Sequence, residues 1–431
     1  MGIPGKAILA CLLVAVVTCL APARPSLAAG AAKSTGPAIT AVSAVLIDAS
    51  TGVLLFDKDG ARKMSPASIT KVLTAAVVLD NLSPGEIVTV SKEASSVPGS
   101  SVYLVENEQV RVKDLLYGLI LNSGNDAAVA LAERVSGAVG EFCHLMNELA
   151  ARIGALDSSF ENPHGLDSDN HYTTARDMAL ITKYAMSKPL FREVAGTTTY
   201  PWEGQAWNTT LINHNRLLWQ YDGCTGVKTG FTSAAKHTLV ASAARDGREL
   251  IAVLLGGDTA DTLRREACLL LDYGFDECLA VLNDPGDIVD TVALPFDKRI
   301  DLIALQPFLA FLPEGAAEDV TRSVKVPPEY LAGREIVRGE TVGRLTYSFD
   351  GTPLGSVELV SSADVTYTTV QRLEFMARDP RSRPPIICAA LAGIAAITVW
   401  QAHRKKARRR SRWFPRKRRR ASRVGTWRRT Y

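Results

Sequence analysis

Ser68-Ile69-Thr70-Lys71 opens a segment in which apolar residues recur at helical spacing as far as Leu82. Ser and Lys three positions apart share one face of a helix, so the Ser68 hydroxyl and the Lys71 amine are expected to lie together. A serine hydroxyl is a poor nucleophile until a base removes its proton. Lys71 can be that base only when neutral, and a pKa near 7 instead of about 10.4 requires about 4 kcal/mol of bias against its charged form. Burial and a nearby cation both supply such bias.

Two further motifs follow in order, Ser123-Gly124-Asn125 and Lys228-Thr229-Gly230. Ser123 is expected to relay a proton toward the leaving amine, and Asn125 to hold a substrate amide. Lys228 is the expected cation beside Lys71. Each residue alone also fits an ordinary structural role, in a loop, on a helix or on a strand surface. The three motifs together predict a serine acyltransferase site.

The third motif precedes a strand-like run, and an edge strand can pair with an extended peptide. Lys228 and Thr229 would then meet the terminal carboxylate of that peptide. Gly230 is expected to leave room for the substrate backbone. The backbone N–H groups of Ser68 and Phe231 are the predicted oxyanion donors.

The order of elements predicts an α+β domain with one antiparallel sheet, over residues 39–278. Strand-like runs cover 41–47, 53–56, 238–243 and 250–255, and helical patterns cover 68–82, 112–121, 126–135, 139–153, 177–186 and 259–273. Residues 279–375 have short β-rich runs punctuated by Pro and Gly, which predicts a second, smaller β-rich domain.

Both ends of the chain carry targeting signals. Residues 1–28 have a charged start, a short apolar run and a small-x-small triplet at Ser26-Leu27-Ala28, which predicts a signal peptide followed by a linker over 29–38. Residues 384–402 contain no charged residue and are predicted to be a transmembrane helix. The basic tail 403–431 is then expected in the cytoplasm, with the body anchored on the outer face of the membrane. An uncleaved N-terminal anchor and a buried or interfacial C-terminal helix are the alternatives.

The formal net charge of +4 hides an uneven distribution, because the tail 403–431 alone contains 15 Lys and Arg residues and no acid. The body that precedes it is therefore acidic, and no nucleic-acid partner is expected. Four cysteines lie in the predicted exported body: Cys143, Cys224, Cys268 and Cys278. Free thiols are expected, with a disulfide between Cys268 and Cys278 left open. The spacing of Cys and His predicts no metal site, and no cofactor is expected.

The three motifs resemble those of class A β-lactamases and penicillin-binding proteins. The wider context resembles the low-molecular-mass penicillin-binding proteins, the D-alanyl-D-alanine carboxypeptidases. The matching stretches are 64–71, 114–119, 123–128, 162–166 (Asn-Pro-His-Gly-Leu), 171–179 and 222–234. The pair Lys236-His237 departs from the family, which usually has a Gly and an aromatic residue soon after the third motif.

The resemblance implies a transpeptidase-like fold and the removal of terminal D-alanine from pentapeptide stems of peptidoglycan, with β-lactams as inhibitors. Ser68 would be the acyl-ester nucleophile, Lys71 the proton acceptor, Ser123 the third catalytic residue and Lys228 the carboxylate binder. His164 and Asp177 lie in matching stretches and are secondary candidates for ordering the cleft, with purely structural roles equally open.

Three alternative functions remain open from the sequence. A β-lactamase would need a deacylating carboxylate, for which Glu161 is a candidate. An endopeptidase acting on cross-links would use the same site. A non-catalytic wall-binding protein would not require intact Ser68 and Lys71.

Overall fold

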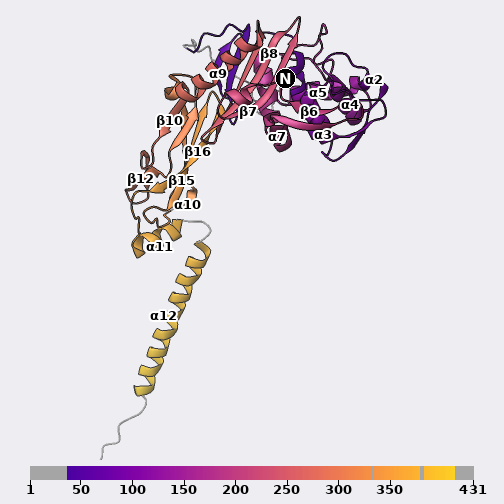
Figure 1. Ribbon diagram of the computed structural model, residues 1–431. Helices are drawn as coiled ribbons and strands as arrows, with labels where there is room; N and C mark the ends of the chain where they lie inside the picture. The colour runs from indigo at the N-terminus through magenta and orange to yellow at the C-terminus, as the bar shows by residue number, and fades with distance from the viewer. Residues whose placement is uncertain (1–35, 332, 379–382, 413–431) are drawn as a thin grey trace, which may run out of the picture. The chain divides into compact units, whose positions relative to one another are not determined.

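The computed structural model describes residues 36–331, 333–378 and 383–412 (Figure 1). These residues form two compact units. The first contains the described residues up to 284 together with 306–323 and 345–357, and the second contains 285–305, 324–344 and the described residues from 358 onward. The predicted signal peptide, most of the predicted linker and residues 413–431 of the basic tail lie outside the described residues.

A five-stranded antiparallel sheet is the centre of the first unit. Its order is β2 (Leu54–Lys58), β1 (Ser43–Asp48), β9 (Arg248–Gly257), β8 (Lys236–Arg245) and β7 (Cys224–Thr232). The four predicted strand runs are confirmed as β1, β2, β8 and β9. Because β7 stands at the end of this order, the strand that carries the third motif has a free edge within the sheet.

Helices cover both faces of this sheet (Figure 1). The larger group is α1 (Lys71–Asn81), α3 (Val112–Leu121), α4 (Asn125–Ser136), α5 (Val139–Arg152), α6 (Ala175–Met186) and α7 (Pro189–Gly196), and the opposite face packs on α9 (Ala260–Glu277). Successive residues of β1 alternate between the two cores, Val45 in one and Leu46 in the other, as strand geometry requires. The predicted helices are confirmed, with ends shifted by a few residues.

α1 is buried on every side from Lys71 to Val78. A helix surrounded in this way belongs to the centre of a domain. It is preceded by the 3₁₀ turn η1 (Ala67–Thr70), so the first motif lies at the junction of the turn and the helix.

Short elements that the sequence patterns did not indicate connect the main ones. They are β3 (Ile87–Thr89), α2 (Lys92–Ser95), β4 (Gln109–Arg111), β5 (Thr199–Glu203), β6 (Asn208–Ile212) and α8 (Leu217–Gln220). β5 and β6 form a hairpin with Thr199 opposite Ile212 and Glu203 opposite Asn208.

The region after α9 is rich in strands, as predicted. β10 (Leu279–Asn283) pairs with β13 (Phe308–Phe311). A five-stranded sheet has the order β11 (Ile288–Leu294), β12 (Lys298–Ala304), β16 (Thr352–Ser361), β15 (Thr341–Phe349) and β14 (Thr321–Lys325). The short helices here are α10 (Pro328–Leu331), α11 (Thr369–Arg378) and a second 3₁₀ turn, η2 (Ala316–Asp319).

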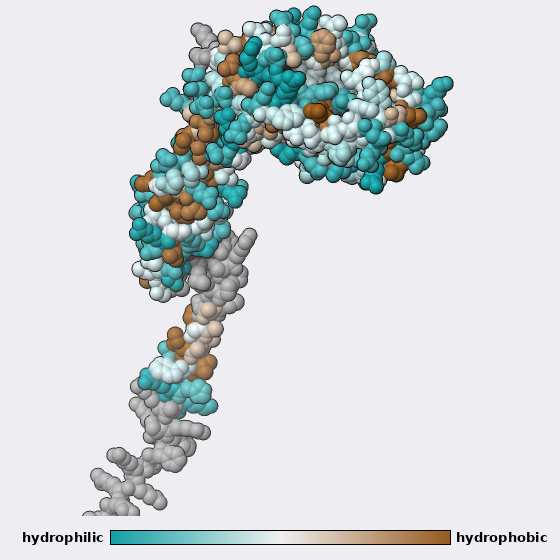
Figure 2. Space-filling model, in the orientation of Figure 1, coloured by the Kyte–Doolittle hydropathy of each residue, from teal (hydrophilic) through white to brown (hydrophobic). Residues whose placement is uncertain are grey.

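α12 (Arg383–Arg412) includes the segment predicted to cross a membrane and continues into the basic tail. Its side chains at Ile394, Ile397, Val399 and Trp400 are exposed, and Figure 2 shows hydrophobic residues gathered along this helix. Among the residues that the structure describes, no helix has both the length and the apolar character needed to span a bilayer. The predicted transmembrane helix over 384–402 is therefore not supported. Cys143, Cys224, Cys268 and Cys278 carry free thiols.

Candidate active site

The backbone around Ser68 is held from two sides. Thr238 on β8 donates its hydroxyl to the carbonyl of Pro66 at 2.9 Å. Thr70, on the turn, shares a 2.9 Å hydrogen bond with Nε2 of the buried His171. Ala67, directly before Ser68, is buried with φ of 51°, a left-handed conformation that a packed environment must hold in place. The half-buried Ser68 is thus presented on a rigid turn.

Lys71 makes three hydrogen bonds and is fully buried. Its Nζ lies 3.2 Å from Ser68 Oγ, 2.7 Å from Asn125 Oδ1 and 2.7 Å from the carbonyl oxygen of His164. Burial lowers the pKa of Lys71 well below its usual value, and the charge of Lys228 lowers it further, against the opposing effect of Asp126. This is the environment that a lysine base requires.

The segment 162–166 packs closely against this helix start. Thr74 donates to the carbonyl of Pro163 at 2.6 Å, and Asn162 Oδ1 accepts the N–H of Gly165 at 2.7 Å. Gly165 has φ of +87°, and a Cβ there would lie 1.9 Å from the carbonyl oxygen of Ala67, so only glycine fits. The segment therefore places the His164 carbonyl directly on the Lys71 amine.

The hydrogen bond between His164 and Lys71 is made by the backbone carbonyl of His164 and not by its imidazole. Nδ1 accepts the N–H of Leu166 at 3.2 Å. Burial, followed by the charges of Lys71 and His171, lowers the pKa of His164 to about 3, which keeps the ring neutral. His164 contacts Lys71 through a backbone carbonyl oxygen, which every residue carries. The residue type at position 164 therefore could not predict this contact.

The second motif forms the turn between α3 and α4. Ser123 has φ of 63° and is 4% exposed, and its Oγ has no hydrogen-bond partner among the described residues. Asn125 has both ends of its amide occupied, because Oδ1 accepts from Lys71 and Nδ2 donates to the carbonyl of Pro98 at 2.7 Å. Ser123 is thus a buried hydroxyl free to bond a ligand, whereas Asn125 orients Lys71 in this structure.

Asp126 is a site residue that the sequence analysis did not single out. It is 1% exposed, and its carboxylate accepts the backbone N–H groups of Val102 and Leu104, each at 3.1 Å, and the Ser101 hydroxyl at 2.5 Å. The loop 101–104 is therefore fastened to the start of α4. The sequence feature that could have indicated Asp126 is its position as an acidic residue directly after the second motif.

Lys228 is the second buried lysine and is 1% exposed. Its Nζ donates to the carbonyl of Thr229 at 3.0 Å, and burial lowers its pKa to about 7. The two lysines interact electrostatically, since the charge of Lys228 lowers the pKa of Lys71. The structure therefore brings the first and third motifs into one site.

Gly230 is required by close approach of β7 to the nucleophile. A Cβ at this position would lie 2.5 Å from Thr238 Oγ1, 2.8 Å from the Ser68 backbone nitrogen and 3.1 Å from Ala67 Cβ. The Ser68 turn therefore fills the space beside Gly230 on this side of β7, and room for a substrate backbone stays a prediction. Phe231 follows with an exposed ring that packs at 4.6 Å, centroid to centroid, on His237 of the departing Lys236-His237 pair.

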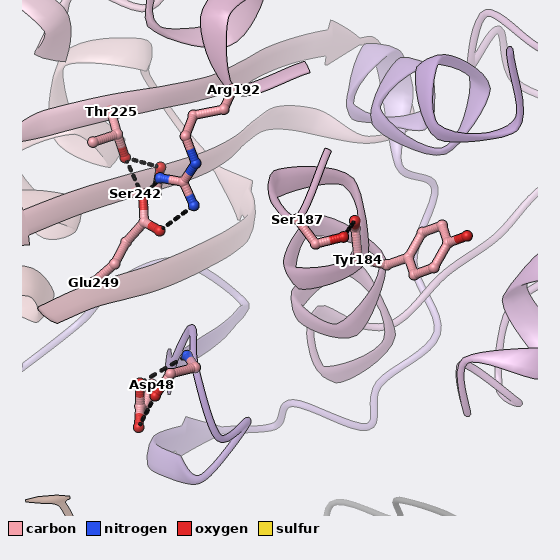
Figure 3. A network of polar contacts seen from close by, with 8 residues as sticks. Asp48, Tyr184, Ser187, Arg192, Thr225, Ser242 and Glu249 are labelled. Carbon is pink, nitrogen blue, oxygen red and sulfur yellow. Dashed lines mark hydrogen bonds and ion pairs between the residues drawn. The ribbon is translucent and has the colours of Figure 1, made fainter. Parts of the chain in front are cut away.

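A polar network fixes the other end of β7 (Figure 3). Glu249 receives two hydrogen bonds from the Arg192 guanidinium, at 2.8 and 2.7 Å, and one from Thr225 at 2.7 Å. Thr225 also contacts the Ser242 hydroxyl at 2.6 Å. Glu249 thus ties α7 and β9 to the start of β7, three residues before Lys228.

Asp177 lies outside the cluster of catalytic candidates. Its carboxylate accepts the Asp157 N–H at 2.8 Å and the Ser158 hydroxyl at 2.6 Å, and burial raises its pKa. Asp177 therefore holds the segment that leads into 162–166. His171, which the sequence analysis did not propose, supports the same segment by accepting the Glu161 N–H at Nδ1, 3.0 Å away.

A sequence model of a protein family, the D-alanyl-D-alanine carboxypeptidases, matches residues 30–259, which is more than half of the chain. The chain belongs to this carboxypeptidase family. A second model, described as the C-terminal domain of penicillin-binding protein 5, matches residues 286–367. The predicted family is thus confirmed, as is a penicillin-binding-protein transpeptidase-like fold followed by a β-rich domain.

Among related carboxypeptidases, DacF of Bacillus subtilis is 33% identical, with 75% of this chain and 86% of the relative covered. DacA of Haemophilus influenzae is 35% identical, with 77% and 86% covered. The crystal structure of penicillin-binding protein 5 from Haemophilus influenzae matches with a TM-score of 0.58 and 31% identity, over 78% of this chain and all of that one. The DD-transpeptidase of Streptomyces K15 matches with a TM-score of 0.54 and 33% identity, over 56% of this chain and 99% of that one.

Proposed function

We propose that the chain is a serine-type D-alanyl-D-alanine carboxypeptidase that removes the terminal D-alanine from peptidoglycan pentapeptide stems. One observation carries the proposal beyond family membership: a fully buried lysine with a lowered pKa lies 3.2 Å from the Ser68 hydroxyl. A nucleophile paired with a neutral base is the minimum that acyl transfer requires.

In acylation, Lys71 takes the Ser68 proton while Ser68 Oγ attacks the carbonyl of the penultimate D-alanine. The backbone N–H groups of Ser68 and Phe231 stabilise the oxyanion. Ser123, whose buried hydroxyl has no partner among the described residues, passes a proton to the leaving amine. Lys228 and Thr229 hold the terminal carboxylate, for which a buried cation and a half-buried hydroxyl at the free edge of β7 are suited.

In deacylation, water attacks the Ser68 ester and the peptide leaves with a new carboxylate. Asn125 and the His164 carbonyl keep Lys71 aimed at Ser68 through both steps. A β-lactam would acylate the same serine. Glu161, the deacylating candidate of the β-lactamase alternative, bonds Ser168 instead of Lys71 or Ser68, so we expect a long-lived penicillin adduct.

We also propose that the enzyme works outside the cytoplasmic membrane, where peptidoglycan stems lie. The signal-like sequence over 1–28 supports export. Attachment through the C-terminal segment stays a prediction. Release of the protein from washed cells by carbonate would contradict an integral anchor, and retention until detergent is added would support one.

The test of catalysis combines D-alanine release from a synthetic pentapeptide with labelling by a fluorescent penicillin. The wild-type protein is expected to release D-alanine and to carry the label for minutes or longer, whereas Ser68→Ala does neither. Loss of the label within seconds would favour a β-lactamase. An unlabelled wild type would refute the serine acyltransferase.

A further inference from the structure

The strand β7, which carries the third motif, contains one extra residue near its start. Cys224 lies opposite Ala243 of β8. Gly226 lies opposite the adjacent residue, Ser242, so Thr225 is an insertion in the pairing of the two strands. Such an insertion is a β-bulge, which changes the direction in which the side chains after it point. The bulge lies just before the lysine of the third motif.

This bulge decides which face of the sheet Lys228 occupies. Side chains alternate between the two faces along a regular strand, so residues four positions apart point the same way. Cys224 and its partner Ala243 pack on the α9 core, and strict alternation would place Lys228 there as well. With the extra residue, Lys228 lies opposite Val240, which belongs to the core on the α1 side. The bulge therefore turns Lys228 toward Lys71 and away from α9.

Three side chains hold the bulged residue in place (Figure 3). The Thr225 hydroxyl lies 2.7 Å from Glu249 Oε1 and 2.6 Å from the Ser242 hydroxyl. Because a carboxylate can only accept, Thr225 donates its single proton to Glu249 and accepts from Ser242. Ser242 is completely buried, so its hydroxyl needs this partner. Glu249 is fixed in turn by the two hydrogen bonds from Arg192 of α7.

The position of this network matters more than its contribution to stability. The Arg192 side chain is 45% exposed, and an ion pair with so exposed a partner stabilises a fold little. However, a shift of one residue in the pairing of a strand moves every later side chain to the other face. Backbone N–H and C=O groups occur at every residue, so side-chain contacts must select between the two registers.

We propose that Thr225 and Glu249 are positioning residues for Lys228: by fixing the bulge, they keep the Lys228 amine on the face where Lys71 and the substrate carboxylate lie. Neither residue touches the substrate, and both act through the register of β7. The proposal rests on the proposed function, in which Lys228 binds the terminal carboxylate. It adds residues outside the active site that determine the preference for a free carboxylate.

The experiment compares Thr225→Val and Glu249→Ala with the wild type on two synthetic peptides, which differ only in a free or an amidated terminal carboxylate. The wild type is expected to prefer the free carboxylate in kcat/KM. Both variants should lower this preference about tenfold, near the lower limit for one hydrogen bond to a charged group. Glu249→Gln keeps an oxygen acceptor for the Thr225 hydroxyl and should retain most of the preference.

The matched control is Asp57→Ala. Asp57 lies on β2, at the opposite edge of the same sheet, and its carboxylate pairs with Arg176 of α6 at 2.5 Å. This variant loses a similar link between strand and helix but leaves β7 unchanged, so it should keep the wild-type preference. A second readout is the alkaline limb of the kcat/KM profile, because burial lowers the pKa of Lys228 to about 7. A displaced, better hydrated amine has a higher pKa, so this limb should move to higher pH in Thr225→Val and not in the control.

Hydrogen exchange at the amides of residues 226–228 gives a readout that does not depend on activity. Exchange there should be faster in Thr225→Val than in the wild type or in Asp57→Ala. If folded Thr225→Val and Glu249→Ala keep the wild-type preference and alkaline limb, the positioning role is wrong and the carboxypeptidase stands. An equal loss of preference in Asp57→Ala would also overturn that role. A wild type that releases no D-alanine would instead refute the proposed function, and the exchange rates alone would then decide whether Thr225 holds the register.

Discussion

Replacing Gly230 by alanine tests whether the distance between β7 and the Ser68 turn sets the rate of acylation. The added Cβ would stand 2.8 Å from the Ser68 backbone nitrogen and 2.5 Å from Thr238 Oγ1. The Thr238 hydroxyl cannot rotate away freely, because it donates to the Pro66 carbonyl on the same turn. The strand and the turn must therefore separate.

The size of the effect follows from this geometry. A contact of ordinary length needs about 3.4 Å, so β7 must move by about 0.6 Å relative to Ser68. The two proposed oxyanion donors, the N–H groups of Ser68 and Phe231, lie on the two parts that separate. A 1 Å misplacement can cost about 100-fold in rate, and loss of one oxyanion donor costs about 100-fold to 1,000-fold. We expect acylation to slow by about 10-fold to 100-fold, with a loss of about 1–3 kcal/mol in the free energy of unfolding.

The assay is the second-order rate constant for acylation by a fluorescent penicillin, with D-alanine release measured in parallel. The control is Gly274→Ala in α9, where the new Cβ would lie 2.5 Å from Leu250 Cδ1 and 2.7 Å from Leu46 Cδ2. This control overpacks the opposite core to a similar degree and leaves β7 in place. Its stability should fall while its acylation rate stays close to wild type.

Acylation of Gly230→Ala at the wild-type rate, or an equal slowing of Gly274→Ala, would refute a role for this spacing in acylation. The first result would mean that the gap between β7 and the turn does not set the oxyanion geometry. The second would mean that any strain in this sheet reaches Ser68.

Three further predictions concern charge. The kcat/KM profile should be bell-shaped against pH, because Lys71 must be neutral while Lys228, with a pKa lowered to about 7, must be charged to bind a carboxylate. Lys228→Arg should remove the loss of activity above about pH 7. An alkaline limb that stays unchanged in this variant would contradict the prediction. Burial lowers the pKa of His171 from 6.5 to about 4. Between these two pH values the histidine therefore binds a proton in the unfolded chain and not in the folded one. Stability should fall by about 3 kcal/mol between pH 6.5 and 4 through this residue, and urea midpoints of His171→Gln should lose that part of the pH dependence. Asp126→Asn should shift the acidic limb of the kcat/KM profile to lower pH, because the Asp126 charge raises the pKa of Lys71. The same substitution should lower the melting temperature, because it weakens the hold on the 101–104 loop.

The sequence predicted those parts of the fold that depend on local periodicity. The α3 pattern over 112–121 agrees with the helix at both ends, and the runs over 238–243 and 250–255 lie inside the strands β8 and β9. Local patterns could not predict the strand order, because the pairing of Val45 with Val253 joins segments that lie far apart in the sequence. The β5–β6 hairpin was missed because residues 199–212 alternate weakly and include Pro201 and Gly204.

For the site, residue types revealed which motifs meet but not how each atom is used. Asn125 was expected to hold a substrate amide, which stays a prediction, and in this structure its own amide bonds Lys71 and the Pro98 carbonyl. His164, a secondary candidate for ordering the cleft, contacts Lys71 through its carbonyl oxygen, which any residue could supply. At Gly230 a side chain would meet the Ser68 turn, and the room expected there for a substrate backbone stays a prediction. Such details depend on the closeness of segments far apart in sequence.

With Lys228 and Lys71 in their proposed roles, the two buried lysines would couple recognition of the substrate to activation of the base. In the free enzyme Lys228 has a pKa lowered to about 7, so at neutral pH it is charged only part of the time. A substrate carboxylate at Lys228 raises that pKa and fixes the charge. The fixed charge lowers the pKa of Lys71 further, which keeps the base neutral when a substrate with a terminal carboxylate is bound. A substrate that lacks this carboxylate should therefore lose kcat as well as affinity, because it leaves Lys71 less fully deprotonated.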